Sequence, residues 1–140
     1  MKKSKLKELY EKYKLDKDDF WTQQVGKNTY TIVSRAGIEK IQNQEQLVVR
    51  FEALVVGPTY CAVKCYVSKD AKQIETFSSA LNDGVKNRNT YTNYVLEMAE
   101  KRAFARGVLK FTEFYQYGVF SEDEADSFKK TENSINLIKQ

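Results

Sequence analysis

The chain has 140 residues, of which 41% are hydrophobic and 30% are charged, a composition typical of a single globular domain. Its net charge of +4 is a mild basic bias, and the absence of histidine removes the commonest general base and the commonest metal ligand. No apolar run approaches the ~20 residues that span a bilayer, and no apolar signal core follows Met1, so we expect a cytoplasmic protein without a membrane partner.

Residues 1–17 predict a basic amphipathic helix. This segment holds seven lysines, and its apolar residues recur at helical spacing. The apolar positions are Leu6, Leu9, Tyr10, Tyr13 and Leu15. Two interpretations stay open: the helix docks on the domain with its lysines in solvent, or the lysines contact nucleic acid or another anionic surface.

The core domain is expected over residues 18–128 and begins with short elements. The sequence Gly26-Lys27-Asn28 indicates a turn, and Tyr30–Val33 indicates a short strand. Ser34 is a suitable N-cap, because its hydroxyl can accept from the first free amides of a helix over about residues 35–42.

Three apolar runs then predict strands over residues 47–56, 60–68 and 73–80, separated by two short loops. This order favours an antiparallel meander with one covered face. The residues expected on that face are Phe51, Val55, Cys61, Val63, Cys65 and Val67. The predicted fold class is α+β: a three-stranded meander, or a four-stranded one, packed against one long helix, with flanking N- and C-terminal helices.

The cysteines are expected to be small core residues. Cys61 and Cys65 point to one face of a strand but lie about 13 Å apart at the usual rise per residue, which is too far for a disulfide or a shared metal. We expect no metal and no cofactor.

Catalysis is not expected either, because the chain has no Walker loop, nucleophile elbow or histidine dyad. Two carboxylate clusters are present, but neither falls at the end of a core strand, and we interpret both as helix caps and solvated faces. The clusters are Asp16, Asp18 and Asp19, and Glu122, Asp123, Glu124 and Asp126.

A helix from about Thr90 to Phe111 is expected to cover the meander. On a wheel of about 100° per residue, one apolar stripe faces the sheet. The stripe consists of Tyr91, Tyr94, Val95, Met98, Ala105 and Leu109. Arg102 falls within this stripe, where a charge is costly unless it is paired or lies beside a groove. Either Arg102 bonds to buried acceptors of the protein, or it lines a groove and contacts phosphate.

Residues 85–110 carry six basic side chains against two glutamates, with tyrosines between them. Cations offset phosphate charge and rings stack on bases without reading sequence, which is what a single-strand binder needs. The candidate nucleic-acid-binding residues are Lys86, Arg88, Lys101, Arg102, Arg106, Lys110, Tyr91 and Tyr94. For the two tyrosines, core packing is the competing interpretation.

The C-terminal region predicts a short helix and a tail. Ser121 and Glu124 fit the S-x-x-E capping box, which favours an acidic helix through Phe128. Residues 129–140 have few apolar side chains and are expected to form a polar tail.

The order of these elements and the helical run Glu97–Lys110, EMAEKRAFARGVLK, resemble the β-β-β-α core of the phage single-strand annealing proteins, the Red-beta, RecT, Erf and Sak class. The stretch with Phe20-Trp21, Tyr30-Thr-Ile and Gly37-Ile-Glu-Lys-Ile is also similar to the segment that opens this core. The resemblance implies assembly into rings or filaments on DNA. It implies nucleic-acid contact for Lys101, Arg102 and Arg106, and for Lys86 and Arg88 before the helix.

We therefore expect an ATP-independent protein that binds and anneals single-stranded DNA in phage or mobile-element recombination, as a homo-oligomer in the host cytoplasm. The alternative is a small phage protein-binding regulator or anti-defence factor that binds no nucleic acid. Oligonucleotide binding that weakens steeply with salt would separate the two hypotheses.

Overall fold

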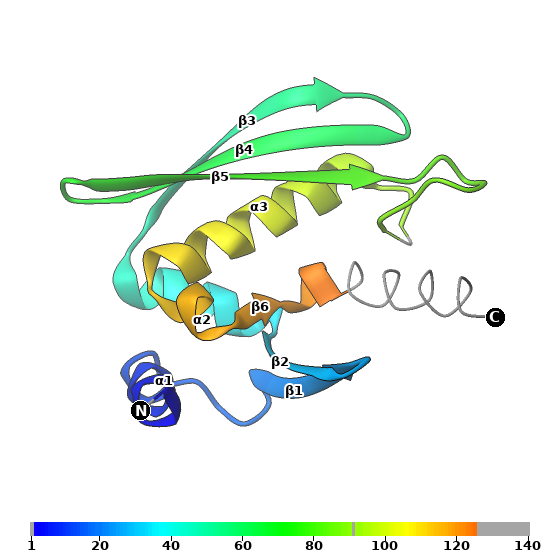
Figure 1. Ribbon diagram of the computed structural model, residues 1–140. Helices are drawn as coiled ribbons and strands as arrows, with labels where there is room; N and C mark the ends of the chain where they lie inside the picture. The colour runs from blue at the N-terminus through cyan, green and yellow to red at the C-terminus, as the bar shows by residue number, and fades with distance from the viewer. Residues whose placement is uncertain (1, 91, 126–140) are drawn as a thin grey trace.

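The computed structural model describes residues 2–90 and 92–125. Its elements in chain order are α1 (Lys2–Lys12), β1 (Phe20–Val25), β2 (Asn28–Val33), α2 (Arg35–Glu45), β3 (Val48–Val56), β4 (Tyr60–Lys69), β5 (Lys72–Leu81), α3 (Val95–Phe111), the 3₁₀-helix η1 (Phe114–Tyr117) and β6 (Val119–Ser121). Figure 1 shows the three long strands as one layer, α3 and α2 beneath them, and α1 with the β1–β2 hairpin on the far side of these helices. The predicted α+β class is confirmed.

The long strands form the predicted meander. β3 pairs antiparallel with β4, and β4 pairs antiparallel with β5, which gives the order β3-β4-β5. Alternate residues of β4 face α3 and are buried. They are Cys61, Val63, Cys65 and Val67. Both cysteines are free thiols within this inward set, so their expected place in the core is confirmed.

The helix α3 lies directly under β4 and β5. A Cβ added at Gly107 would lie 2.6 Å from Cγ2 of Val67 and 3.2 Å from Oγ1 of Thr76, so only glycine permits this approach. Thr76 Oγ1 also donates to the carbonyl of Ala103 at 2.8 Å, which ties β5 to the helix.

The strand β3 projects beyond α3, and two residues that were expected in the core are exposed. Phe51 remains 38% exposed and its ring meets Phe104 at the margin of α3, with 6.5 Å between centroids. Val55 is 46% exposed because a β-bulge after Ala53 shifts the register, so that Val55 pairs with Ala62 and points to the outer face. Phe51 therefore lies on the predicted face, opposite Cys65, but is covered only in part. The prediction for Val55 was wrong, because the bulge turns this residue to the other face.

A second sheet, in the order β1-β2-β6, was predicted only in part. β1 and β2 form an antiparallel hairpin around Gly26, whose φ of +62° favours glycine. β6 pairs parallel with β2, with Val119 opposite Thr31. The sequence prediction included residues 30–33 but neither β1, which has a polar Thr-Gln-Gln centre, nor the three-residue β6.

Helix boundaries follow local hydrogen bonds. Ser34 Oγ accepts from the amide of Gly37 at 3.0 Å, which confirms the predicted N-cap of α2. The helix α3 begins at Val95 and not at Thr90. This start is later than predicted because the hydroxyls of Thr90 and Thr92 accept from backbone amides two residues further along, which favours turns over helix.

The helix α1 docks on the domain through its apolar side. Leu9 and Tyr13 are buried, and Tyr10 stacks on Phe20 with 4.0 Å between ring centroids. Tyr13 Oη donates to Glu45 Oε1 at 2.6 Å, which fixes α1 to the end of α2. Contact of the α1 lysines with an anionic surface stays a prediction.

The C-terminal cap also forms, since Ser121 Oγ accepts from the amide of Glu124 at 3.3 Å and residues 122–125 are helical. The continuation of the predicted helix to Phe128, the tail over residues 129–140 and the site candidate Tyr91 lie outside the described residues. Over the described ranges, no helix combines the length and apolarity needed to cross a membrane.

Candidate nucleic-acid interface

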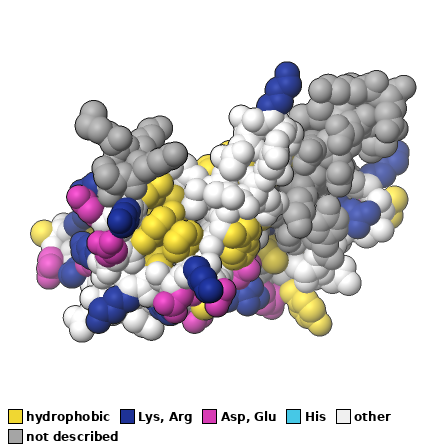
Figure 2. Space-filling view, turned by 90° about the horizontal axis from the view of Figure 1, so that it is seen from below, with side chains coloured by type: hydrophobic (Ala, Val, Ile, Leu, Met, Phe, Trp, Pro, Cys, Tyr) yellow, Lys and Arg dark blue, Asp and Glu magenta, His cyan; other side chains and the backbone are white. Residues whose placement is uncertain are grey.

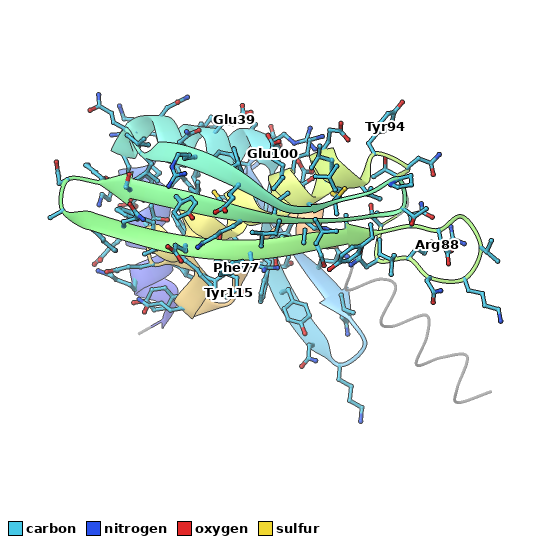
Figure 3. The ribbon with its side chains drawn as sticks, turned by 90° about the horizontal axis from the view of Figure 1, so that it is seen from above. Glu39, Phe77, Arg88, Tyr94, Glu100 and Tyr115 are labelled. Atoms are coloured by element: carbon cyan, nitrogen blue, oxygen red, sulfur yellow. The ribbon has the colours of Figure 1, made fainter. Side chains whose placement is uncertain are left out.

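A groove of about 590 Å³ lies along the free edge of β5. Both the meander and the segment after α3 contribute to its walls. The ring-bearing residues of the groove are Tyr60, Phe77, Tyr115 and Phe120, and the charged ones are Arg102, Arg106 and Glu124. Figure 3 shows Phe77 and Tyr115 next to each other at this edge of the sheet. Rings and charges therefore share one open channel.

The edge of β5 is closed by side chains from outside the sheet. Arg106 Nη1 donates to the carbonyl of Phe77, and Arg102 Nη1 donates to that of Ser79 at 3.1 Å. Leu81 is held by Asn89, whose side-chain oxygen accepts from the Leu81 amide and whose amide donates to the Leu81 carbonyl, both at 2.8 Å. These contacts satisfy backbone groups that an edge strand would otherwise leave open.

Arg102 is a structural residue in this arrangement. It is 2% exposed, and its guanidinium donates to the carbonyls of Ser79, Asn89 and Asp123 and to the Asn89 side chain, at 2.6–3.1 Å. These hydrogen bonds to neutral acceptors offset the cost of removing the guanidinium charge from water. Of the two interpretations left open for Arg102, the geometry favours bonding within the protein, so we leave this residue out of the proposed contact with phosphate.

Arg106 is the cation that faces the groove. Its side chain is 28% exposed, and its Nε lies 3.6 Å from Oε1 of Glu124, too far for a hydrogen bond. Among the described residues, neither of these two buried atoms has a hydrogen-bond partner. Burial raises the pKa of Glu124, and the nearby Arg106 charge opposes this rise. The protein therefore satisfies only part of the hydrogen-bonding capacity of Arg106.

A ladder of rings continues from the groove to the β1–β2 hairpin. Lys110 Nζ lies over the ring of Tyr115 at 5.1 Å. Tyr115 meets Phe120 edge to face at 5.3 Å, and Phe120 meets Tyr30 of β2 at 5.5 Å. One cation is thus followed by three rings in contact, which supplies one positive charge and several ring surfaces next to the groove.

A second row crosses the outer face of the meander toward the same groove. The guanidinium of Arg50 lies 4.0 Å from the centroid of the Tyr66 ring. Lys64 Nζ lies 4.8 Å from the Tyr66 ring and 5.4 Å from the ring of Phe77, which lines the groove. Glu75 pairs with Lys64 at 3.2 Å, so this row is less basic than the groove itself.

The other predicted site residues lie in two separate places. Lys101 lies on the α2 side of α3, beside a cavity of about 170 Å³ that it shares with Arg35 and Phe104. Lys86 and Arg88 are exposed in the loop after β5, and Figure 3 shows Arg88 well beyond the end of the sheet. The predicted single basic cluster is therefore split, because neighbours on α3 face different flanks of the helix.

Tyr94 does not lie on the apolar stripe as predicted. It is 70% exposed just before α3, because the helix starts one residue later. Core packing is therefore excluded for Tyr94, and Figure 3 shows it on the β3 side of the sheet, away from Phe77 and Tyr115.

Sequence reasoning missed the rings that line the groove. They are Tyr60, Phe77, Tyr115 and Phe120. A signal was present for Tyr115 and Phe120, since residues 111–120 hold five aromatic side chains, but the short strand that contains Phe120 was not predicted. This segment is positioned by contacts of η1 and β6 with α3 and by the pairing of β6 with β2.

The carboxylate clusters pair with cations of the protein. Lys40 Nζ lies 2.6 Å from Asp19 and 3.2 Å from Asp16. Burial alone would raise the pKa of Asp19, but the hydrogen bonds from Lys40 and from the Asp16 amide hold it below its ordinary value. Over residues 2–90 and 92–125, no cluster of three or more acidic or cysteine side chains is arranged to bind a metal ion.

Figure 2 shows the face turned away from the meander. Hydrophobic side chains gather in its middle, and lysine or arginine and acidic side chains are mixed along its margin. Positive charge is therefore not concentrated on the visible part of this face.

A comparison with protein-family models, curated proteins and solved structures found no significant match to this chain. Function is therefore argued from the site and from the motif resemblance alone.

Proposed function

We propose that this protein binds single-stranded DNA in the groove along β5 and anneals complementary strands without ATP. The observation that carries the proposal is that rings and a cation line one channel: Phe77, Tyr115 and Phe120 offer stacking surfaces, and Arg106 offers positive charge. Lys110 adds a second charge next to the groove, over the ring of Tyr115. Base stacking contributes ~1–3 kcal/mol per base and tolerates any sequence, which suits a protein that must act on many strands.

The annealing step rests on the resemblance of residues 97–110 to the phage single-strand annealing proteins. In this proposal the groove holds one strand through phosphates and a few stacked rings, and the remaining bases stay available for pairing. Lys86 and Arg88 extend the contact beyond the end of β5, and assembly into rings or filaments aligns neighbouring grooves along the strand. The proposed context is phage or mobile-element recombination in the host cytoplasm.

Fluorescence anisotropy with labelled single-stranded oligonucleotides at several salt concentrations tests binding. The logarithm of the affinity is expected to fall with the logarithm of salt by about 0.7 per phosphate contacted. Arg106→Ala is expected to weaken binding by about tenfold (~1.4 kcal/mol). Lys101→Ala removes the same charge from the other flank of α3 and is the matched control, with affinity expected to stay near that of the wild type.

Two results would contradict the proposal: no oligonucleotide binding at low salt, or equal losses for Arg106→Ala and Lys101→Ala. Thermal unfolding of each variant shows whether a loss of binding is a loss of fold. Annealing is measured separately, by energy transfer between dyes on two complementary strands without nucleotide. If the protein binds DNA but does not accelerate pairing of the two strands, it coats single strands and does not anneal them.

One observation favours the alternative, a protein-binding regulator without nucleic-acid binding. Leu54, Val55 and Val56 are consecutive residues of β3 that are 46–65% exposed, and contiguous exposed apolar side chains mark protein interaction sites. The anisotropy experiment decides between the two functions, since only the DNA-binding function predicts a steep dependence on salt.

A further inference from the structure

Within residues 2–90 and 92–125, no strand pairs with the outer edge of β3, and this edge differs from that of β5. β3 is the outer strand in the order β3-β4-β5, and Figure 1 shows it at the outside of the upper layer. In an antiparallel sheet, the N–H and C=O of one residue point to the same side, and successive residues alternate between the two sides. Every second residue of β3 therefore presents its backbone groups at the edge.

The contacts on β5 determine which residues these are. The carbonyl of Phe77 accepts from Arg106, so the backbone groups of Phe77 point away from β4. Phe77 pairs with Lys64, whose backbone groups therefore point toward β3, where Lys64 pairs with Glu52. Glu52 thus bonds inward, and its neighbours point outward. The edge residues of β3 are Val49, Phe51 and Ala53.

The side chains along this edge are apolar and open to solvent. Val48, Phe51 and Val56 are 64%, 38% and 65% exposed. Natural sheets usually protect an edge with proline, inward-pointing charges or a covering element, because an open edge pairs with other strands. β3 has no proline, and its two charges, Arg50 and Glu52, lie on the outer face, opposite Tyr66 and Lys64 of β4. The edge therefore has the features of a strand-pairing surface.

We propose that β3 pairs antiparallel with β3 of a second copy of this chain, about a two-fold axis at Phe51. This register places Phe51 opposite Phe51 of the second copy and Val49 opposite Ala53, so that edge groups meet edge groups. It also places Arg50 opposite Glu52 of the second copy, and Glu52 opposite Arg50, both on the outer face. The two meanders become one six-stranded sheet.

Charge complementarity selects both the occupant and the register. A shift that centres the pairing on residue 50 places Arg50 opposite Arg50, and a shift that centres it on residue 52 places Glu52 opposite Glu52. Like charges directly opposite each other destabilise a strand pair, and opposite charges stabilise it. Only the register centred on Phe51 brings each charge against its opposite, and the strand is then complementary to itself.

This contact is independent of nucleic acid and differs from ring assembly. A two-fold interface uses the same surface on both copies and closes at two, whereas a ring or filament needs two different surfaces that join head to tail. The β5 groove is lined mainly by β4, β5 and α3, and its one lining residue on β3, Leu54, lies outside the paired residues 49–53, so the pairing leaves the groove open.

Sedimentation equilibrium without oligonucleotide tests the proposal. The wild type is expected to dimerise, and R50E or E52R is expected to weaken the dimer by about tenfold or more, because each change sets like charges opposite each other at two places. The double variant R50E/E52R restores both pairs and is expected to recover the dimer. An equimolar mixture of the two single variants is expected to form heterodimers for the same reason.

A cysteine cross-link provides a second measurement if charge reversal disturbs the fold. In the proposed register the two Phe51 residues form a hydrogen-bonded pair, whose Cα atoms lie about 5.5 Å apart, a separation that a disulfide can span. Phe51→Cys is expected to cross-link under mild oxidation, and Phe77→Cys, at a 52% exposed position on the other edge, is the control. The native Cys61 and Cys65 are both fully buried and do not compete.

Three results would overturn the proposal: a wild type that stays monomeric at every concentration, charge reversals that leave the dimer unchanged, or equal cross-linking of Phe51→Cys and Phe77→Cys. Recovery by the double variant and by the mixture supports it, because a general loss of stability cannot be reversed by a second charge reversal.

Discussion

The two edge strands of the meander differ in how their outer edges are covered. At the β5 edge, Arg102, Arg106 and Asn89 bond to backbone groups of the strand, and a groove lined with rings lies beside them. At the β3 edge, the strand extends past α3 with its apolar side chains exposed. The difference follows from the position of α3, which lies under β4 and β5 and supplies both arginines to the nearer edge.

The burial of an arginine determines whether its guanidinium stabilises the fold or stays accessible to a ligand. Arg102 and Arg106 both donate to carbonyls of β5, yet Arg102 is 2% exposed and Arg106 keeps part of its side chain in the groove. Their positions on α3 differ by about one helical turn. Because of this offset, Arg102 is buried against the backbone of β5, whereas Arg106 is close enough to solvent to contact a phosphate.

The largest effect is expected for Arg102→Ala, which removes the seal at the β5 edge. Four hydrogen bonds disappear and several buried acceptors lose their partner, so we expect a loss of about 3 kcal/mol or more in unfolding free energy. Urea denaturation measures it. Arg102→Lys should recover little, because an ammonium cannot span acceptors spread around a planar guanidinium. A loss below about 1 kcal/mol would show that the seal does not stabilise the fold.

A smaller effect is expected for Gly107→Ala, which tests why α3 favours one edge. The added methyl group would lie 2.6 Å from Val67, so the helix must move away from β4 and β5, at a cost of about 1–3 kcal/mol. Thermal unfolding measures the change, and Glu100→Ala on the exposed side of α3 is the control. An unchanged melting temperature for Gly107→Ala would mean that the helix approach is not tight.

The smallest effect is expected for Glu124→Gln, which sharpens the role of Arg106. Because burial raises the pKa of Glu124, the folded protein holds the proton more tightly than the unfolded chain. This contributes stability at acidic pH that is lost as the pH rises through the raised pKa. The variant should match the wild type at acidic pH and be slightly more stable at neutral pH.

The same variant should bind oligonucleotide several-fold more tightly at neutral pH, since a negative charge beside Arg106 is removed. The wild type should approach that affinity as the pH falls, whereas the variant should show a flatter pH dependence. Anisotropy across a pH series measures both. Identical pH profiles for the two proteins would exclude Glu124 as the cause.

Local patterns predicted much of the fold. The meander, the N-cap at Ser34 and the cap at Ser121 each depend on neighbours within a few residues, and all three are present. The exposure of Phe51 was not predictable, because alternation identifies two faces of a strand but not how far a helix extends beneath it. The exposure of Val55 was not predictable either, because the bulge after Ala53 interrupts the alternation. The late start of α3 was not predictable either, because helix propensity does not show whether Thr90 and Thr92 adopt helix or turns closed by their hydroxyls.

The candidate site was less predictable than the fold. The sequence places Lys101, Arg102 and Arg106 within six residues of one another, yet the structure gives them three environments: the α2 flank, the buried seal and the groove. The rings that accompany Arg106 come from β5 and from the segment after α3. Their meeting depends on contacts between distant parts of the chain, which no local pattern encodes.

The parallel pairing of β6 with β2 has a consequence for how the protein is made. Beside it, the amide of Arg35 donates to Glu122 across a separation of 87 residues. The hairpin that opens the fold therefore gains its third strand only after residues 119–121 leave the ribosome. Until then the edge of β2 stays unpaired, so the small sheet is expected to be completed after the β3-β4-β5 meander.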